Sequence, residues 1–167
     1  MRKTVKLGIL ISFALIISLF ENMMPIPIPV PGVKLGLSNI VLLVTLLMFG
    51  LKEGLIVGVS KSLLMVLVSG RLASLPYSLT GTIFALMAMY LSHRYLSRWL
   101  SLIGVSELGS LFFNFGQLLA ASFILSNIRI MVYLPLMALM GVATGYIVGI
   151  TSKFVSDRLK KGDIDVR

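Results

Sequence analysis

Six apolar runs, separated by short polar, proline or glycine segments, dominate this sequence of 167 residues. A helix that crosses a bilayer needs about 20 mostly apolar residues. With 57% hydrophobic and 13% charged residues, the chain carries too much apolar surface for a water-soluble globule. The sequence therefore predicts an all-α integral membrane bundle of six transmembrane helices. The predicted spans are about Leu7–Met24, Gly36–Phe49, Leu51–Ser69, Leu75–Leu91, Leu102–Leu125 and Ile130–Phe154.

The placement of lysine and arginine predicts how this bundle lies in the membrane. With the N-terminus in the cytoplasm, eleven of the fifteen basic residues fall on the inner side and three on the outer side, while Lys61 lies inside a run. This bias follows the positive-inside rule for an even number of helices. We therefore predict a multi-pass protein of the cell (plasma) membrane with both termini cytoplasmic. Residues 1–156 are predicted to form the transmembrane domain and residues 157–167 a short charged cytoplasmic tail.

The stretch from Pro25 to Gly32 alternates proline with aliphatic residues, so it is predicted to be extended and not helical. It follows the first run, which has no small-residue cleavage site and is expected to be retained as a helix. On the outer side, this stretch either lies against the bundle as a lid or serves as a stiff connector.

The composition excludes several kinds of chemistry. Without cysteine and with a single histidine, His93, the chain cannot supply a thiol nucleophile, an iron–sulfur cluster or a multi-histidine metal site. The basic residues behind the net charge of +9 lie between apolar runs, so they indicate topology and not nucleic-acid binding. We expect the lipid bilayer as surroundings, no metal, no cofactor and no autonomous enzyme activity.

Lys61 is the first candidate site residue. It lies about ten residues into the third run, near the bilayer midplane. Spacings of three and four residues put it on one helix face with Gly54, Gly58 and Ser62. A charge at this depth usually faces the bundle interior, so Lys61 is a candidate to bind an anionic group of a solute. The alternative is a lysine that extends to the interface or pairs with a buried glutamate.

The fifth run carries a second polar stripe. Glu107, Ser110, Asn114 and Gln117 are spaced by three, four and three residues and share one side of a helix. Asn114 and Gln117 therefore either line a polar site or form hydrogen bonds to neighbouring helices.

Three basic residues are expected on the outer side: Lys34, Arg71 and Arg129. If they converge over an outer cavity, they and Lys61 favour an anionic small-molecule ligand. Arg71 and Arg129 also suit ordinary positions at the ends of spans, and Asn39 suits a helix cap.

Small residues recur at four-residue spacing in two runs. In the last run, Gly141, Gly145 and Gly149 predict close packing of two helices inside the bundle. The first run carries a weaker form of this pattern, which is a candidate face for docking a membrane partner and comprises Gly8, Ser12, Ala14 and Ser18.

Several motifs along the chain occur together in one family of bacterial membrane proteins. They are Pro31–Ile40, Gly50–Gly54, Gly70, Gly81, Asn114–Gln117, Leu134–Pro135 and Gly141–Gly145. On these motifs the chain resembles the Gx transporter family, also labelled heptaprenyl diphosphate synthase component I, over roughly residues 5–155. Family members often have histidine before the asparagine of the fifth run, where this chain has Phe113.

This resemblance implies a role in transport. The family is similar in size and layout to the S components of energy-coupling factor transporters, six-helix subunits that bind small molecules from outside. Such subunits pair with a transmembrane coupling subunit and two ATPases. The resemblance assigns Lys34 and Asn39 to the mouth of the pocket and the small residues of the first run to the face toward the partner.

Two alternatives remain open. The synthase label implies an accessory subunit in polyprenyl diphosphate or quinone metabolism, partnered by a prenyl synthase. Catalysis of chain elongation would need aspartate-rich motifs that hold magnesium, and no two acidic residues are adjacent here, so this chain would be a non-catalytic subunit. Other family members resemble the membrane subunit of flavin- and quinone-dependent electron-export systems, which would imply a redox partner.

Overall fold

The computed structural model describes residues 3–24 and 34–164, so the predicted proline-rich stretch lies outside the described residues. The prediction of an all-helical bundle of six helices is confirmed, and the described residues contain no strand. The elements are α1 (Lys3–Asn22), α2 (Asn39–Phe49), α3 (Leu51–Ser69), α4 (Ser74–Tyr95), α5 (Leu102–Ile124), the 3-10 helix η1 (Ile128–Tyr133) and α6 (Leu134–Ile164).

Four of these helical segments are long and apolar enough to cross a membrane: α1, α4, α5, and η1 together with α6. The chain is therefore a membrane protein by length and composition of its helices. α3 has the required length but carries Lys52, Glu53 and Lys61. α2 has 11 residues and is about 16 Å long, roughly half the thickness of a bilayer core. α6 continues beyond Ser156 as helix to Ile164.

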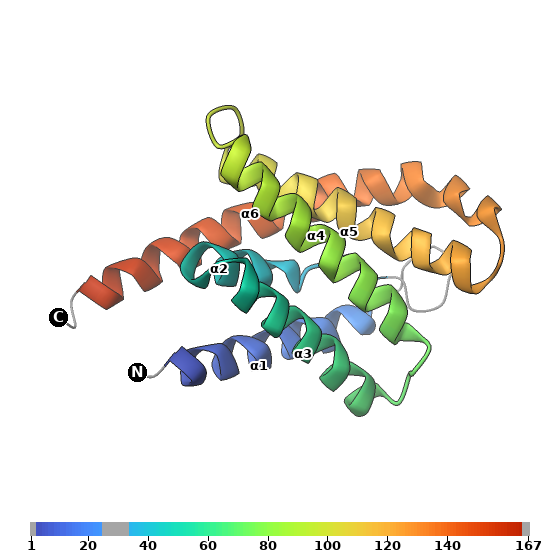
Figure 1. Cartoon of the computed structure of the whole chain (residues 1–167), viewed down its shortest axis with the longest axis horizontal. Helices are drawn as coiled ribbons and strands as arrows, with labels where there is room; N and C mark the ends of the chain where they lie inside the picture. The colour runs from blue at the N-terminus through green and yellow to red at the C-terminus, as the bar shows by residue number, and fades with distance from the viewer. Residues whose placement is uncertain (1–2, 25–33, 165–167) are drawn as a thin grey trace.

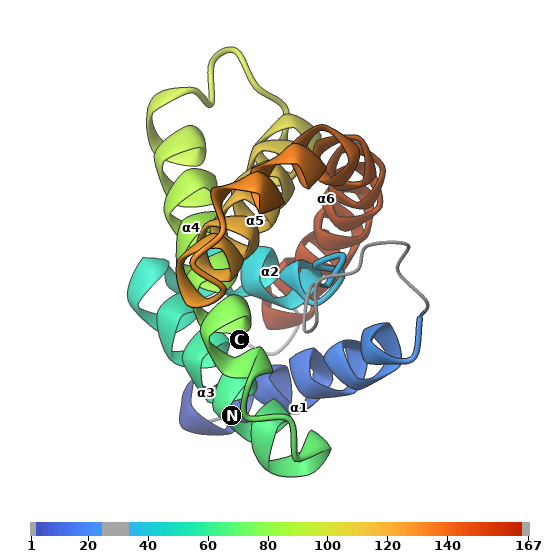
Figure 2. The ribbon, with the colours of Figure 1, turned by 90° about the vertical axis from the view of Figure 1, so that its right-hand side faces the viewer.

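The helices form two groups around α2. α4, α5 and α6 pack in sequence on one side, and α3 packs against both α4 and α1. Figure 2 shows α2 between the group of α4, α5 and α6 and the group of α1 and α3. Among the described helices, α1 contacts only α2 and α3. α1 is therefore a peripheral helix, and its outward side exposes large apolar residues, among them Ile9, Phe13, Ile16 and Phe20.

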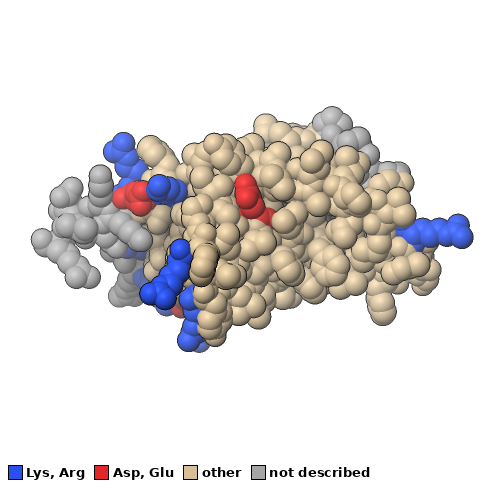
Figure 3. Space-filling view, turned by 90° about the horizontal axis from the view of Figure 1, so that it is seen from above, with Lys and Arg blue, Asp and Glu red and all other residues tan. Residues whose placement is uncertain are grey.

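Charged residues gather at the end of the bundle where both termini lie (Figures 1 and 3). We call this end the basic end, because it carries exposed lysines and arginines from four helices and the segment after α4. At the opposite end, Arg71 follows α3 and Arg129 lies in η1. The exposed basic residues of the basic end include Lys3, Lys52, Arg94, Arg98, Lys153 and Arg158.

The predicted packing through glycines of α6 is confirmed. A Cβ added at Gly145 would lie 2.6 Å from Cα of Glu107 in α5, and one at Gly149 would lie 2.7 Å from Cα of Ile103. Gly141 faces the side chain of Asn114 in the same way, at 2.7 Å. The absence of side chains at these three positions lets the backbones of α5 and α6 approach closely.

Candidate binding site at mid-depth

Before α2, a non-helical segment, Lys34–Ser38, lies in the interior of the bundle, and we call it the entry segment. The N-terminus of α2 lies close to Lys61, ten residues into α3, and to Phe113, eleven residues into α5. α2 therefore begins near the middle of the bundle and runs only to the basic end (Figure 1). Non-helical backbone at this depth must find its hydrogen-bond partners within the protein.

Side chains from two helices, α5 and α1, supply those partners. Gln117 of α5 accepts a hydrogen bond from the Lys34 N–H at 2.7 Å and donates one to the Lys34 carbonyl at 2.8 Å. Glu21 of α1 accepts from the N–H groups of Gly36 and Leu37. The entry segment is thus fixed by residues that lie on different sides of the bundle.

Glycine is required at one position of this segment. Gly36 has φ +91°, a conformation that favours glycine. A Cβ at Gly36 would also lie 2.9 Å from both the side-chain amide nitrogen of Asn39 and the ring of Phe113. Phe113 therefore packs directly against the entry segment.

Three charged side chains are buried around the entry segment. Glu21, Lys34 and Lys61 are 1%, 4% and 2% exposed. Lys61 donates a hydrogen bond from Nζ to Oγ of Ser38 at 2.9 Å, and the Glu21 carboxylate attracts both lysines. Within residues 3–24 and 34–159, no ion pair closer than 4.0 Å joins these groups. Two cations and one anion give the cluster an excess of positive charge.

Lys34 lies in the entry segment, outside the helices. Its burial lowers the pKa of the ammonium group below the ordinary value, and this is the largest effect. The negative charge of Glu21 opposes that shift, while the positive charge of Arg71 adds to it. An anion placed next to Lys34 would therefore stabilise a charge that its surroundings disfavour.

The two amides of α5 both form hydrogen bonds between segments of the chain. Asn114 donates from Nδ2 to the carbonyl of Met137 in α6 at 2.7 Å. Gln117 donates to the carbonyl of Lys34 and lies 3.4 Å from Oδ1 of Asn114. The interhelical role considered for these residues is therefore observed, and it connects α6 to the entry segment through α5.

Asn39 differs from these amides, because it has no partner. Its side chain is fully buried at the start of α2, and neither Nδ2 nor Oδ1 has a hydrogen-bond partner among the described residues. Leaving a buried polar group unpaired costs about 1–3 kcal/mol. Other buried atoms without a partner include Oε2 of Glu21, Oγ1 of Thr82 and Oγ of Ser110.

The structure brings together five of the seven residues predicted to bind a ligand. They share the cluster around the entry segment and are Lys34, Asn39, Lys61, Asn114 and Gln117. Arg71 and Arg129 are exposed at the opposite end. Arg71 still affects Lys34 electrostatically.

The four small residues predicted for docking on α1 divide between two faces. Gly8 and Ser12 are exposed, and a Cβ at Gly8 would meet nothing within 4 Å. Ala14 and Ser18 are buried in the bundle. In this conformation a docking surface on α1 can therefore include Gly8 and Ser12 but not Ala14 and Ser18.

Glu21 and Ser38 also belong to the site, although neither was predicted as a ligand-binding residue. Ser38 precedes α2 as its N-cap, but its side chain forms no capping hydrogen bond and instead accepts one from Lys61. The Glu21 carboxylate accepts a hydrogen bond from the backbone N–H of Gly36, fifteen residues later in the chain. The available signal was an acidic residue in an otherwise apolar stretch of the first run, just before the proline-rich segment.

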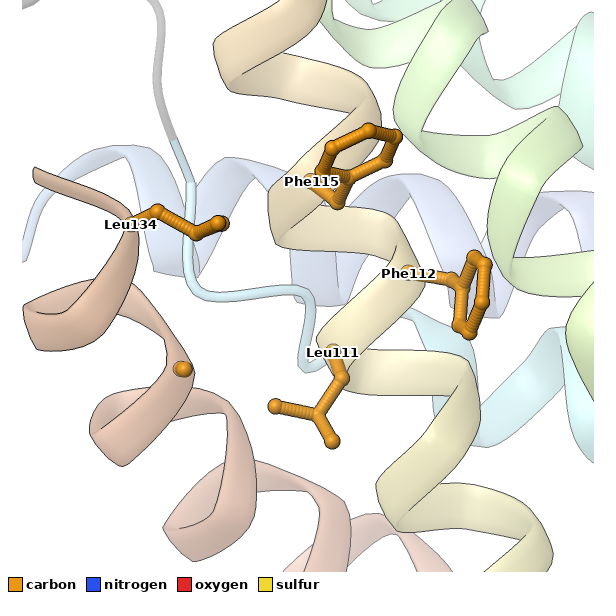
Figure 4. Close-up of a pocket in the computed structure, with 5 residues that line it drawn as sticks. Leu111, Phe112, Phe115 and Leu134 are labelled. Atoms are coloured by element: carbon orange, nitrogen blue, oxygen red, sulfur yellow. The ribbon is translucent and has the colours of Figure 1, made fainter. Parts of the chain in front are cut away.

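A separate groove lies between α5 and α6 on the outside of the bundle (Figure 4). It measures about 340 Å³ and is lined by apolar side chains only, including Leu111, Phe115 and Leu134. In Figure 4, Leu111 and Leu134 lie on the two facing helices. None of its lining residues belongs to the polar cluster.

Comparison with known proteins identifies the family. A family model described as heptaprenyl diphosphate synthase component I matches residues 10–155, which include all six helices in whole or in part. No curated protein and no solved structure matches the chain. Because the match spans most of the sequence, the chain belongs to the heptaprenyl diphosphate synthase component I family.

Proposed function

We propose that this protein is the membrane-embedded subunit that binds a small anionic solute at the cluster around the entry segment, and that it works with partner subunits in transport. It would lie in the cell membrane with the basic end in the cytoplasm, in line with the excess of lysine and arginine at that end. The solute would enter from the opposite side.

The observation that carries this proposal is the fully buried, unpaired side chain of Asn39 beside two buried lysines. Hydrogen bonds to the backbone explain Gln117 and Glu21 as structural residues. They do not explain a buried amide with four unused hydrogen-bonding positions. A solute with an anionic group and a hydrogen-bonding group would use both Lys61 and Asn39.

The half-length of α2 supports the same proposal. Many transporters bind their substrates near the bilayer midplane, where a discontinuous helix starts and its positive dipole end faces the substrate. α2 starts at that depth, and Lys34 and Lys61 add positive charge there. The arrangement therefore favours a net negative solute.

The direct test is to purify the protein from its native membrane and identify small molecules released on denaturation by mass spectrometry. We expect an anionic compound in the wild type and its loss in Asn39→Leu and Lys61→Met. Ser12→Leu, an exposed change on α1, serves as the matched control and should retain the compound. Equal recovery from all variants would remove the cluster as the binding site.

The partner is tested in the same preparation. Co-purification of a transmembrane coupling subunit with ATPases supports the transport role, and Gly8→Leu should then release that subunit, because Gly8 is open to the surroundings of α1. A complex that survives this change would exclude docking through Gly8.

A second candidate function rests on the family match. The family description names a component of a prenyl synthase. In that case the chain would be a non-catalytic membrane subunit, since its acidic residues do not form an aspartate-rich motif. Prenyl synthase activity that depends on this protein would favour this role, whereas a full rate in its absence would dismiss it.

A third candidate is a membrane subunit of a flavin- or quinone-dependent electron-export system. Co-purification of a redox partner in place of a coupling subunit would favour it.

A further inference from the structure

Glu21 is the acidic residue of the cluster around the entry segment, and it carries more than its contact with that segment requires. The N–H groups of Gly36 and Leu37 both donate to the same carboxylate oxygen, Oε1. A glutamine at this position would supply the same acceptor oxygen without a charge. The negative charge and the second oxygen of Glu21 are therefore not explained by the hydrogen bonds to the entry segment.

The second oxygen of this carboxylate, Oε2, is buried and has no hydrogen-bond partner among the described residues. Glu21 as a whole is 1% exposed, and within residues 3–24 and 34–159 no lysine or arginine nitrogen lies within 4.0 Å of it. Burying a carboxylate is costly unless both of its oxygens find donors. A positively charged donor is the strongest partner for such an oxygen, so Oε2 favours an ammonium group of a ligand.

Asn39 lies beside Glu21 and offers both a donor and an acceptor. The two side chains meet at Gly36, whose N–H donates to Glu21 and whose Cβ, if present, would lie 2.9 Å from Nδ2 of Asn39. Neither Nδ2 nor Oδ1 of Asn39 has a partner among the described residues. Oδ1 can accept from the same ammonium group, while Nδ2 can donate to an acidic group next to it.

Two lysines give the same cluster its positive charge. Lys61 uses one of its three Nζ hydrogens for Oγ of Ser38, at 2.9 Å, and keeps two for a ligand. Lys34 is buried as well, and the Glu21 carboxylate attracts both lysines. A ligand with complementary charges therefore has two acidic groups for the lysines and one ammonium group for Glu21.

From this complementarity we propose that the solute is an amino acid with a second acidic group, such as aspartate or glutamate. The proposal rests on the binding of an anionic solute proposed above and names the class of that solute. Its acidic groups would face Lys34 and Lys61, and its ammonium group would donate hydrogen bonds to Glu21 and Asn39. Glu21 is then the residue that selects an amine, and the single net negative charge of the solute balances the excess positive charge of the cluster.

Isothermal titration calorimetry on the full-length protein, purified in a non-ionic detergent, tests this proposal. L-Aspartate, L-glutamate and O-phospho-L-serine carry two acidic groups and an amine. Succinate and glutarate lack the amine, and L-alanine lacks the second acidic group. We expect at least one of the first three probes to bind about tenfold more tightly than all the others, because a hydrogen bond between charged groups contributes about this factor.

Glu21→Gln separates selection of the amine from a structural role, because glutamine keeps the acceptor oxygen for the entry segment. The variant should bind the preferred amino acid about tenfold more weakly, and should bind succinate or glutarate at least as tightly as the wild type, since a negative charge has been removed. Structural damage would weaken both kinds of ligand together. Glu107→Gln is the matched control, the same substitution on α5 outside the cluster, and should bind all probes as the wild type does.

The outcomes separate this proposal from the binding of an anion itself. Lys61→Met should weaken the amino acids and the plain dicarboxylates alike, and unchanged binding in this variant would remove the cluster as the site. Equal binding of aspartate and succinate to the wild type, or parallel losses in Glu21→Gln, would overturn selection of an amine and leave the anion site intact. Failure of all three amino-acid probes to bind, or release of an anionic compound without an amine from the native protein, would also overturn it.

Discussion

The contact between α5 and α6 and the cluster around the entry segment are both buried, yet they are stabilised in different ways. Gly141, Gly145 and Gly149 allow two backbones to touch, so that contact depends on shape. The cluster depends on hydrogen bonds between a non-helical segment and the side chains of Gln117, Glu21 and Lys61. The contact between α5 and α6 should not tolerate larger side chains. The cluster should not tolerate the loss of a polar group that forms a hydrogen bond, but it should tolerate the loss of one without a partner.

The largest effect is expected for Gly145→Leu. The new side chain would collide with the backbone of α5, since even a Cβ would lie 2.6 Å from Cα of Glu107. Overpacking commonly costs about 1–3 kcal/mol, and a clash with backbone should exceed this range. Thermal unfolding in detergent measures the loss. Gly8→Leu is the control at an open glycine, and equal unfolding temperatures of the two variants would refute close packing.

Gln117→Leu should rank second. It leaves both the N–H and the carbonyl of Lys34 buried without a partner, at a cost of about 2–6 kcal/mol. Gln117→Glu keeps an acceptor for the N–H, so its loss should be smaller. Unfolding temperatures that fall in the opposite order would mean that the entry segment does not depend on this amide.

A matched pair of asparagines separates the structural polar groups from the unused ones. Asn114→Leu breaks the hydrogen bond to Met137 and should destabilise the protein by about 1–3 kcal/mol. Asn39→Leu removes an amide without a partner, so stability should be unchanged or slightly higher. Thermal unfolding of ligand-free protein gives both values. A large loss in Asn39→Leu would assign Asn39 a structural hydrogen bond.

The smallest effect on stability is expected for Gly8→Leu. The site is exposed and has no neighbour within 4 Å, so the free energy of unfolding should change by less than about 0.5 kcal/mol. Its effect on a complex is measured separately, by co-purification of partner subunits. A marked loss of stability in the isolated protein would show that the outward face of α1 already packs within the bundle.

The sequence predicted the helices well, because a long apolar segment in a bilayer must satisfy its own backbone hydrogen bonds and therefore forms a helix. Glycine, proline and charged residues marked where these segments end. The spacing on single helices also predicted Lys61, Asn114 and Gln117 as buried polar residues. Helical spacing predicts which residues share a face of a helix, so it could not predict the contacts of the non-helical entry segment. Glu21 was therefore missed, since its partner Gly36 lies across a proline-rich stretch.

The inward direction of Ala14 and Ser18 was equally hard to predict. α1 is apolar on all sides, so its composition does not distinguish the face that contacts α3 from the face that meets lipid. Arg71 and Arg129 could not be placed either, because a charge at the end of a span is favourable whether or not it joins a site.

The short α2 also has a consequence for how the chain is made. It joins α3 through Gly50 alone and cannot span the bilayer core by itself, so the membrane-insertion machinery cannot integrate it as an independent helix. The Gln117 amide that pairs with the Lys34 backbone is synthesised 83 residues later. Until α5 has been inserted, the backbone of Lys34 lacks this partner, so the entry segment must stay hydrated or remain at the interface. The final positioning of α2 is therefore a late event in biosynthesis, after most of the protein has already entered the bilayer.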